Sequence, residues 1–210
     1  MKKIVFTNLP MKKKLKAFKY FVDGNTDIDY DGEVIFPINA VLAKSMTKND
    51  VITVVLIKKL DLEGNGDVNA GAFMKELNTI NRNVGADINY RIIDTPFEED
   101  RDTHEKLLRE MIEEVKEKSL IYADITYGPK SLPIIVFSVL NFAEKFFNCE
   151  IRNIVYGKVD FITKENGESE PSNPILCDMT PLYYLNSVTN SMECKTGQDA
   201  KRILDNLLNI

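Results

Sequence analysis

The segment Asp124-Ile125-Thr126-Tyr127-Gly128-Pro129-Lys130-Ser131 is the most informative part of this sequence. A short apolar strand, predicted over residues 120–125, leads into a glycine-containing turn that ends in a cation, and a helix is predicted over residues 132–147. The turn therefore lies at the carboxyl end of a strand and the amino end of a helix. Free backbone N–H groups and the positive end of the helix dipole favour an anion there, so the turn predicts a phosphate seat.

Composition and charge narrow the class of protein. The chain has 210 residues, 44% of them hydrophobic, which is enough to bury one sizeable core, and we expect a single domain over residues 1–210. The net charge of -5 argues against a broad basic surface, so duplex nucleic acid is not an expected partner. A few local cations would hold an anionic ligand, and the sequence offers Lys130 and the run Lys12, Lys13, Lys14 and Lys16.

Membrane insertion and secretion are both disfavoured. The most apolar window, residues 132–140, is much shorter than the ~20 residues of a membrane-spanning helix. The amino terminus begins like a signal peptide, but Thr7 and Asn8 and then the lysine run interrupt its apolar stretch. The sequence predicts a cytoplasmic protein that does not associate with a membrane.

The cysteines and the histidine match no metal-binding motif. Cys149, Cys177 and Cys194 have spacings that differ from zinc motifs, and His104 has no evident partner. Cys149 precedes a predicted strand and has the character of a small buried hydrophobe rather than a nucleophile. We expect structural cysteines, no metal and no cofactor.

Strands and helices alternate along the chain. Short apolar runs predict strands at residues 3–7, 51–57, 88–93, 120–125 and 151–157, with a weak sixth at 175–178. Helices are predicted at residues 37–46, 70–81, 96–117, 132–147, 182–191 and 198–208. This alternation predicts an α/β, Rossmann-like fold with an open, mostly parallel six-stranded sheet and helices on both faces.

Two of the predicted helices carry start signals. Thr95-Pro96-Phe97-Glu98 places a capping threonine before a first-turn proline, and Thr196-Gly197-Gln198-Asp199 forms a similar capping pattern with aspartate. Apolar stripes on these two helices, at residues 96–117 and 198–208, predict faces that pack in a core. The helix at 132–147 is apolar nearly all round, which predicts burial on several sides and contact with another subunit.

Three segments are predicted to be less regular. Residues 20–34 are expected to form a small hairpin before the helix that begins at Pro37. Gly64-Asn65-Gly66-Asp67 lacks the third glycine of a dinucleotide-binding fingerprint, and this predicts a flexible connection. Residues 165–174 are polar and rich in turn formers, which predicts an exposed excursion.

Ligands of open α/β sheets bind outside the carboxyl ends of the strands, where the strand order reverses. This rule selects the loop Thr7-Asn8-Leu9, the position of Asp94, and residues 126–131. A ligand there would meet a hydroxyl, an amide, backbone N–H groups and one lysine. Such a set suits phosphodiesters or nucleotides.

These residues carry a resemblance to a known family. Asp124-Ile-Thr-Tyr-Gly-Pro-Lys130-Ser-Leu-Pro133 resembles the Asp-hydrophobic-Thr-x-Gly-x-Arg/Lys-Ser-x-Pro signature of CRISPR-associated Rossmann-fold (CARF) domains of type III CRISPR systems. Ile154-Val155-Tyr156-Gly157 resembles the Tyr-Gly strand end of the same branch, and Asp178-Met179-Thr180-Pro181 resembles its Asp-x-Thr-Pro helix start. The resemblance follows the element order over residues 1–208, but only the first motif is specific. Lys130 stands where many relatives carry arginine, which keeps the charge and loses the bidentate geometry.

The resemblance implies a homodimer that binds cyclic oligoadenylate across its two-fold axis. This ligand is a ring of 3′–5′ linked AMP units made by an activated type III complex, and cyclic tetra-adenylate is the ring we expect. Two copies of one loop would then face one symmetric ligand. Carried over to the matching positions, the ligand-binding residues are Thr7, Asn8, Thr126, Tyr127, Gly128, Lys130 and Ser131.

Most of these residues also have a purely structural interpretation. Thr126 is equally typical of a cap or turn, Gly128 of a backbone with positive φ, and Tyr127 either stacks on an adenine or covers the turn. Asp124 is expected to brace loop N–H groups, because a carboxylate aimed at a phosphate would repel it. The lysine run that starts at Lys12 is typical of a solvated surface.

Two functions remain open from the sequence, with a third as a further hypothesis. The chain is either the sensor domain of an effector or a stand-alone ring nuclease, in which a ribose 2′-hydroxyl attacks the adjacent phosphorus without a metal. In the nuclease, Lys130 and Thr7 would be the catalytic residues that offset charge on the phosphoryl oxygens. The third hypothesis is a Rossmann-like enzyme for another nucleotide, or a metal phosphohydrolase with Asp94 and Asp124 as Mg²⁺ ligands. The sequence leaves open the ring size and whether an effector domain follows residue 210 in the native protein.

Overall fold

A computed structural model describes residues 1–22, 24–61, 63–163 and 169–208 of the chain. The chain divides into two compact units, Met1–Thr180 and Pro181–Ile210, and each is described by itself. The first unit contains the sheet and the candidate site. The second contains the rest of the helix that begins at Thr180, together with the last helix.

The sheet of the first unit has seven strands. They are β1 (Lys2–Asn8), β2 (Phe21–Val22), β3 (Val51–Lys59), β4 (Asp87–Thr95), β5 (Leu120–Asp124), β6 (Glu150–Thr163) and β7 (Ser169–Asp178). Their order across the sheet is β2-β7-β6-β5-β1-β3-β4, with an antiparallel β6–β7 pair and parallel pairs elsewhere. The predicted α/β, Rossmann-like fold is confirmed, with seven strands rather than six. The strand that sequence reasoning missed, β2, is two residues long and too short to show a period-2 pattern.

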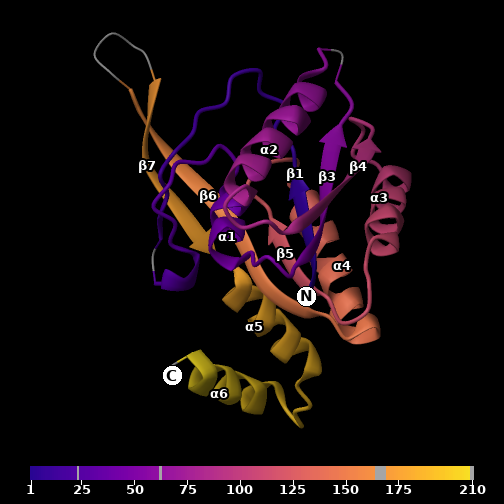
Figure 1. The fold of residues 1–210 in the computed structure, drawn as a ribbon. Helices are drawn as coiled ribbons and strands as arrows, with labels where there is room; N and C mark the ends of the chain where they lie inside the picture. The colour runs from indigo at the N-terminus through magenta and orange to yellow at the C-terminus, as the bar shows by residue number, and fades with distance from the viewer. Residues whose placement is uncertain (23, 62, 164–168, 209–210) are drawn as a thin grey trace. The chain divides into compact units, whose positions relative to one another are not determined.

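Helices cover both faces of the sheet (Figure 1). Helices α1 (Pro37–Ser45) and α2 (Asn65–Asn81) lie on one face, and α3 (Arg101–Glu113) and α4 (Leu132–Phe147) lie on the other. A single turn of 3-10 helix, Thr26–Ile28, precedes α1. Among the described residues, no helix has both the length and the apolar character needed to cross a membrane.

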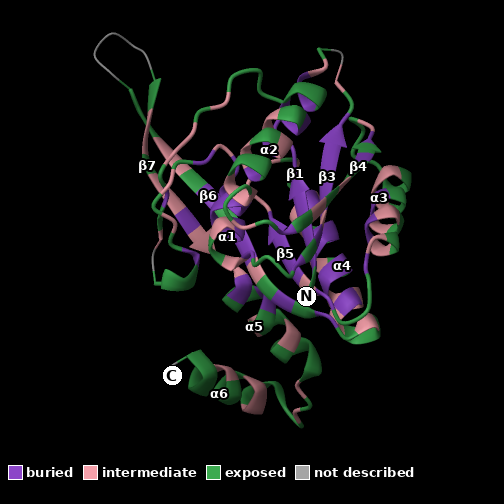
Figure 2. Ribbon diagram, viewed as in Figure 1, coloured by how far each residue is buried: buried purple, intermediate pink, exposed green. Residues whose placement is uncertain are grey.

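The central strands are the most deeply buried part of the molecule (Figure 2). In β1 every residue after Lys2 is buried, and β3 is nearly as well covered. Strand β4 lies at the edge of the sheet and is mostly exposed or half-buried. Because parallel strands covered on both faces are apolar throughout, the continuous apolar runs in the sequence predicted the interior strands well.

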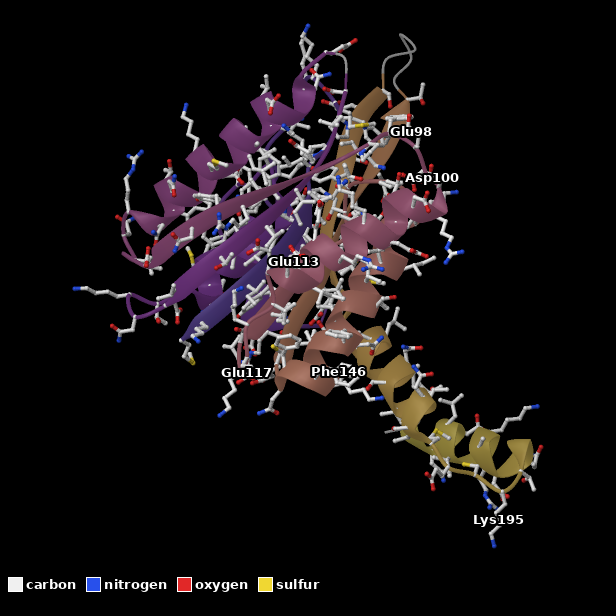
Figure 3. All side chains as sticks on the ribbon, turned by 90° about the vertical axis from the view of Figure 1, so that its right-hand side faces the viewer. Glu98, Asp100, Glu113, Glu117, Phe146 and Lys195 are labelled. Carbon is white, nitrogen blue, oxygen red and sulfur yellow. The ribbon has the colours of Figure 1, made fainter. Side chains whose placement is uncertain are left out.

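Two helix starts differ from their predictions. Helix α3 begins at Arg101 rather than Pro96, and its cap is Asp100, whose side chain accepts a hydrogen bond from the Thr103 N–H at 2.9 Å. Thr95 is the last residue of β4 instead of a helix cap. Helix α2 begins at Asn65, so the segment predicted to be a flexible connection is the first turn of a helix. Figure 3 shows Asp100 beside the start of α3 and Glu113 at its other end.

The β6–β7 hairpin is longer than predicted. Strand β6 continues beyond Gly157 to Thr163, and residues 169–174, predicted to be an excursion, form the first half of β7. Residues 165–168 of that prediction lie outside the described residues. The prediction of a small hairpin in residues 20–34 was wrong for the described residues, because β2 pairs with β7 and Thr26–Ile28 forms a 3-10 turn. Phe18, which precedes this region, forms an isolated antiparallel bridge with Val34 through two N–H···O bonds of 2.9 Å.

The last two helices are α5 (Thr180–Ser191) and α6 (Gly197–Leu208). The predicted capping pattern before α6 is confirmed, because the Thr196 hydroxyl oxygen accepts from the Asp199 N–H at 3.1 Å. The prediction that the apolar stripe of α6 packs in a core was wrong, since none of its described residues is buried. Ile203 and Leu207 are exposed at 41% and 42%.

Candidate functional site

The turn between β5 and α4 lies where the strand order of the sheet reverses. Strand β1 pairs with β3 on one side and β5 on the other, and Thr7 stands opposite Asp124 at the carboxyl ends of β1 and β5. Residues 125–131 continue from β5 to the head of α4. Parallel sheets bind ligands at this kind of position, because the loops on either side diverge and leave space between them.

Gly128 brings the backbone of the turn against the first loop. Its φ is +107°, which disfavours other residues, and a Cβ atom there would lie 2.3 Å from the Asn8 Nδ2 atom. The position therefore requires glycine for conformation and for space. This contact brings together Asn8 and Gly128, which are far apart in the sequence.

Asp124 holds the turn in place through hydrogen bonds to its carboxylate. One carboxylate oxygen accepts a hydrogen bond from the Thr126 N–H at 2.8 Å, and the other accepts from the Ile38 N–H at 3.3 Å. Burial raises the pKa of Asp124 to about 6, against the lowering effect of these two donors. The carboxyl group thus links the turn to the start of α1, as expected of a structural brace.

The side chains of Thr126 and Tyr127 are engaged by the fold. The Thr126 hydroxyl oxygen accepts from the Gly157 N–H at 2.7 Å, which ties the turn to β6. The Tyr127 hydroxyl donates to the Ile35 carbonyl at 3.2 Å, and its half-buried ring packs against the core. Burial and the nearby Asp124 and Glu76 carboxylates raise the pKa of Tyr127 well above its ordinary value.

Lys130 and Ser131 end the turn in different ways. Lys130 is exposed, and its ammonium group has no hydrogen bond or ion pair within the described part of the chain. Ser131 precedes the first residue of α4, and its hydroxyl donates a short hydrogen bond to a carboxylate oxygen of Glu99. A cation without a partner and an acidic side chain therefore lie at the same helix start.

Glu99 is the centre of a polar network that sequence reasoning missed. Its carboxylate accepts from Lys59 Nζ at 2.6 Å and lies 3.1 Å from His104 Nε2, and Lys59 also donates to the Pro96 carbonyl at 2.8 Å. Desolvation raises the pKa of Glu99, but hydrogen bonds from Lys59, Ser131 and His104 outweigh it and lower the pKa to about 2. Glu99 therefore carries a negative charge beside the predicted phosphate seat.

A sequence signal for one member of this network exists. Lys58 and Lys59 follow the predicted strand at residues 51–57 directly, so they stand at the carboxyl edge of the sheet where ligands bind. Only Lys130 and the Lys12 run were predicted as site cations. The structure adds Lys59, which is 7% exposed and lies in the wall of two cavities beside Asn8.

Asp94 and Asp124, the two carboxylates predicted as Mg²⁺ ligands, lie far apart in the structure. Asp124 lies on β5 and Asp94 on β4, with β1 and β3 between them, which places the two strands about 14 Å apart. Asp94 instead forms an ion pair with Lys58 at 3.0 Å. The two residues cannot ligate one Mg²⁺, and no group of three or more potential protein ligands occurs elsewhere in the described chain.

Cys149, the residue before β6, has a structural environment. Cys149 is buried, and its thiol donates to the Lys116 carbonyl at 3.2 Å. Desolvation raises the pKa of the Cys149 thiol. A raised pKa disfavours the thiolate that nucleophilic catalysis needs, which agrees with the structural role expected for this residue.

Two open hollows flank the turn. The first, which we name the Asn8 hollow, has a volume of about 600 Å³ and is lined by residues 8–12, Lys59, Phe97, Glu99 and residues 127–129. The second has a volume of about 470 Å³ and lies between residues 12–20 and β6, with Lys12, Tyr127 and Gly128 shared between the two. Both volumes are in the range of small-molecule binding sites.

The predicted site residues fall into two groups around these hollows. Asn8, Thr126, Tyr127 and Gly128 line one or both of them, whereas Lys130 and Ser131 stand at the head of α4 outside their walls. Thr7 lies beneath the surface at 1% exposure, and its hydroxyl oxygen has no hydrogen-bond partner in the described structure. The Oδ1 atom of Asn8 is buried and also lacks a partner there.

Comparison with known proteins gives one significant similarity among curated proteins. The chain is 30% identical over 86 residues to CRISPR-associated protein MJ1674 of Methanocaldococcus jannaschii. The match covers 41% of this chain and 13% of the relative, so the two proteins share one limited region. No protein-family model matches the chain.

Proposed function

We propose that this chain binds a cyclic oligoadenylate as the sensor domain of an effector in type III CRISPR antiviral signalling. One observation carries the proposal: a glycine turn at the head of α4 lies at the reversal point of the sheet, between two open hollows. The motif of residues 124–133 supports the choice of ligand, and the similarity to a CRISPR-associated protein supports the biological setting.

The turn suits a phosphodiester for physical reasons. Gly128 exposes backbone without a side chain, and the positive end of the α4 dipole lies beside it. The N–H groups of Leu132, Ile134 and Ile135 donate to the carbonyls of Pro129 and Ser131, so the free donors expected at the head of α4 are already paired. Lys130 is an exposed cation at the head of α4, and Lys59 lies in the wall of the Asn8 hollow as the ion-pair partner of Glu99. The buried Oδ1 atom of Asn8 lacks a partner in the described structure. A ring of nucleotides offers phosphates to the cations and hydrogen-bond donors to the amide.

A homodimer forms part of the proposal. Helix α4 exposes two apolar side chains, Ile134 at 71% and Phe146 at 62%, and Phe146 is labelled in Figure 3. Two chains that pack through α4 would bring two copies of the turn toward one axis. A symmetric ring then contacts equivalent residues from both chains.

Binding rather than cleavage is the activity that the geometry supports. The ring-nuclease alternative requires Lys130 and Thr7 beside the same phosphate. Lys130 is exposed, whereas the Thr7 hydroxyl is buried under the turn and lines neither hollow. We therefore propose a sensor, and we make cleavage an outcome of the test.

The test incubates the purified chain with cyclic tri-, tetra- and hexa-adenylate in the presence of EDTA. Calorimetry measures binding, and chromatography measures linear products. We expect tight binding of cyclic tetra-adenylate and an intact ring. Linear product would establish the nuclease alternative, and no binding to any ring would refute the proposal.

Two variants locate the site. Lys130→Ala should weaken ring binding about 10- to 100-fold, as expected for loss of a charge-assisted contact. Gly128→Ala should cost about 1–3 kcal/mol of stability and abolish binding, because its Cβ collides with Asn8. Gly71→Ala, in α2 with no atom within 4 Å of the added Cβ, is the control that should retain stability and binding.

A further inference from the structure

The lysine run is a fixed part of the surface. After β1, the backbone of residues 10–12 is held by Asn69 of α2, whose Nδ2 atom donates to the Pro10 carbonyl at 2.5 Å and the Lys12 carbonyl at 3.1 Å. Asn69 is 3% exposed. At the other end of the run, Phe18 is bridged to Val34. The lysines between these two anchors therefore stand in a defined place.

These lysines form one wall of the second hollow, which we name the lysine–aromatic groove. Lys12, Lys14 and Lys16 line it, and none of its lining residues, which all belong to the described chain, carries a carboxylate. No ion pair to these three lysines occurs within the described residues. The protein as a whole has a net charge of -5, so this local excess of positive charge runs against the composition.

The other wall offers aromatic surface. Tyr156 and Phe161 of β6 line the groove and are exposed at 39% and 62%. Phe18 lies in the wall formed by the lysine run, with the Lys16 ammonium 5.7 Å from the centre of its ring. Positive charge on one side and exposed ring faces on the other are the two elements that bind single-stranded nucleic acid.

We infer that the lysine–aromatic groove is a binding site for a short linear single-stranded oligonucleotide. Lys12, Lys14 and Lys16 contact its phosphates, and Tyr156 and Phe161 stack on its bases. Double-stranded nucleic acid cannot stack its bases on these rings, because its bases already pair and stack with each other. The groove shares Thr126, Tyr127 and Gly128 with the turn before α4. The inference concerns a linear ligand and is carried by lysines and aromatic residues outside that turn, so it does not depend on the proposed function.

The test measures fluorescence anisotropy of a labelled linear hexa-adenylate RNA with the full chain over a series of salt concentrations. Three phosphate contacts predict a slope of about -2 in the logarithm of affinity against the logarithm of salt concentration, and Lys14→Ala should reduce this slope by about 0.7. Phe161→Ala should weaken binding about 5- to 100-fold. A hexa-adenylate that fails to bind at low salt overturns the inference.

Matched controls separate the groove from general surface effects. Lys75→Ala removes an exposed lysine of α2, and Phe21→Ala removes an aromatic residue that is also 62% exposed but does not line the groove. Both should bind like the wild type. If these two variants lose as much affinity as Lys14→Ala and Phe161→Ala, the groove is not the site.

Two competitors test the ligand class and the location. When cyclic tetra-adenylate is present at a saturating concentration, Lys14→Ala and Phe161→Ala should still weaken the oligonucleotide binding that remains. If the ring abolishes oligonucleotide binding and Phe161→Ala does not weaken it, the oligonucleotide binds at the turn before α4. That result would overturn the inference. A poly-glutamate peptide that displaces the RNA at equal concentration would show recognition of charge alone and would also overturn it.

Discussion

At the scale of single residues, Asp124 shows how one carboxyl group organises the candidate site. It is 2% exposed and accepts hydrogen bonds from two separate backbone segments, the turn at Thr126 and the start of α1 at Ile38. Burial nevertheless favours its protonated form and raises its pKa to about 6. The brace is therefore sensitive to pH in a range where ordinary aspartates are not.

This shift gives a prediction for stability against pH. A carboxyl group whose pKa is raised in the folded state contributes most to the stability of the protein below its unfolded pKa of 3.8. This contribution to stability is lost as the pH rises through about 6. The shift corresponds to about 3 kcal/mol. Asp124→Asn does not titrate at this position. As the pH falls from about 7 to about 4, the free energy of urea unfolding of the wild type should therefore rise relative to that of Asp124→Asn. A constant difference between the two proteins would contradict the raised pKa.

Glu99 gives a second prediction at the same scale. It places a negative charge at the head of α4, where the proposed ligand carries phosphate. Glu99→Gln removes this repulsion and leaves Lys59 available, so affinity for cyclic tetra-adenylate should rise about 10-fold. The control is Glu98→Gln, the neighbouring exposed glutamate (Figure 3), which should bind like the wild type. Calorimetry that finds weaker binding in Glu99→Gln would make Glu99 a ligand contact instead of a competitor.

At the scale of elements, the sequence predicted helices well where their apolar runs were long. The bounds of α4 match the predicted range of residues 132–147, because the apolar run fills the whole helix and Asn148, with φ of +50°, ends it. The start of α3 was predicted wrongly for a tertiary reason. Thr95 pairs with Lys59 in the sheet, and its carbonyl accepts from the Leu60 N–H at 2.9 Å. Pairing with β3 thus keeps Thr95 extended, despite a local sequence that favours a helix cap.

The two possible caps of α3 are distinguishable by mutation. Asp100→Ala should lower the midpoint of thermal unfolding, because the Thr103 N–H loses its acceptor. Thr95→Val should leave the midpoint unchanged or raise it, since the buried Thr95 hydroxyl has no partner within the described residues. Differential scanning calorimetry of both variants decides the matter. A larger loss in Thr95→Val would restore the cap that the sequence suggested.

At the scale of the whole molecule, the general position of the site was predictable and its full membership was not. The rule for parallel sheets places the loops after β1 and β5 together, and this predicted the meeting of Asn8 and Gly128. The Lys59–Glu99–Ser131 network joins the end of β3 to the loops before α3 and α4 through side chains. Strand periodicity reports which face a residue occupies, so it carries no information about such contacts between loops.

The proposed homodimer gives a prediction at this scale. Ile134→Lys combined with Phe146→Lys should weaken self-association at least about 10-fold, because it places charge on an apolar face, while the circular dichroism spectrum stays unchanged. Val68→Lys, at a residue of α2 that is 66% exposed, is the control. Sedimentation equilibrium measures the association. A double variant that still dimerises like the wild type would place the interface on another surface.

The position of β1 in the sheet has a consequence for how the protein folds. All of β1 pairs with β3 on one side, but on the other side Lys3 pairs with Leu120, so the central strand is completed only by a segment from much later in the chain. Closing such a long loop is entropically costly and slows folding. The candidate site spans the same junction, since it needs Asn8 and the head of α4 together. Ligand-binding competence should therefore appear late in refolding, after the β1–β3–β4 part of the sheet has formed.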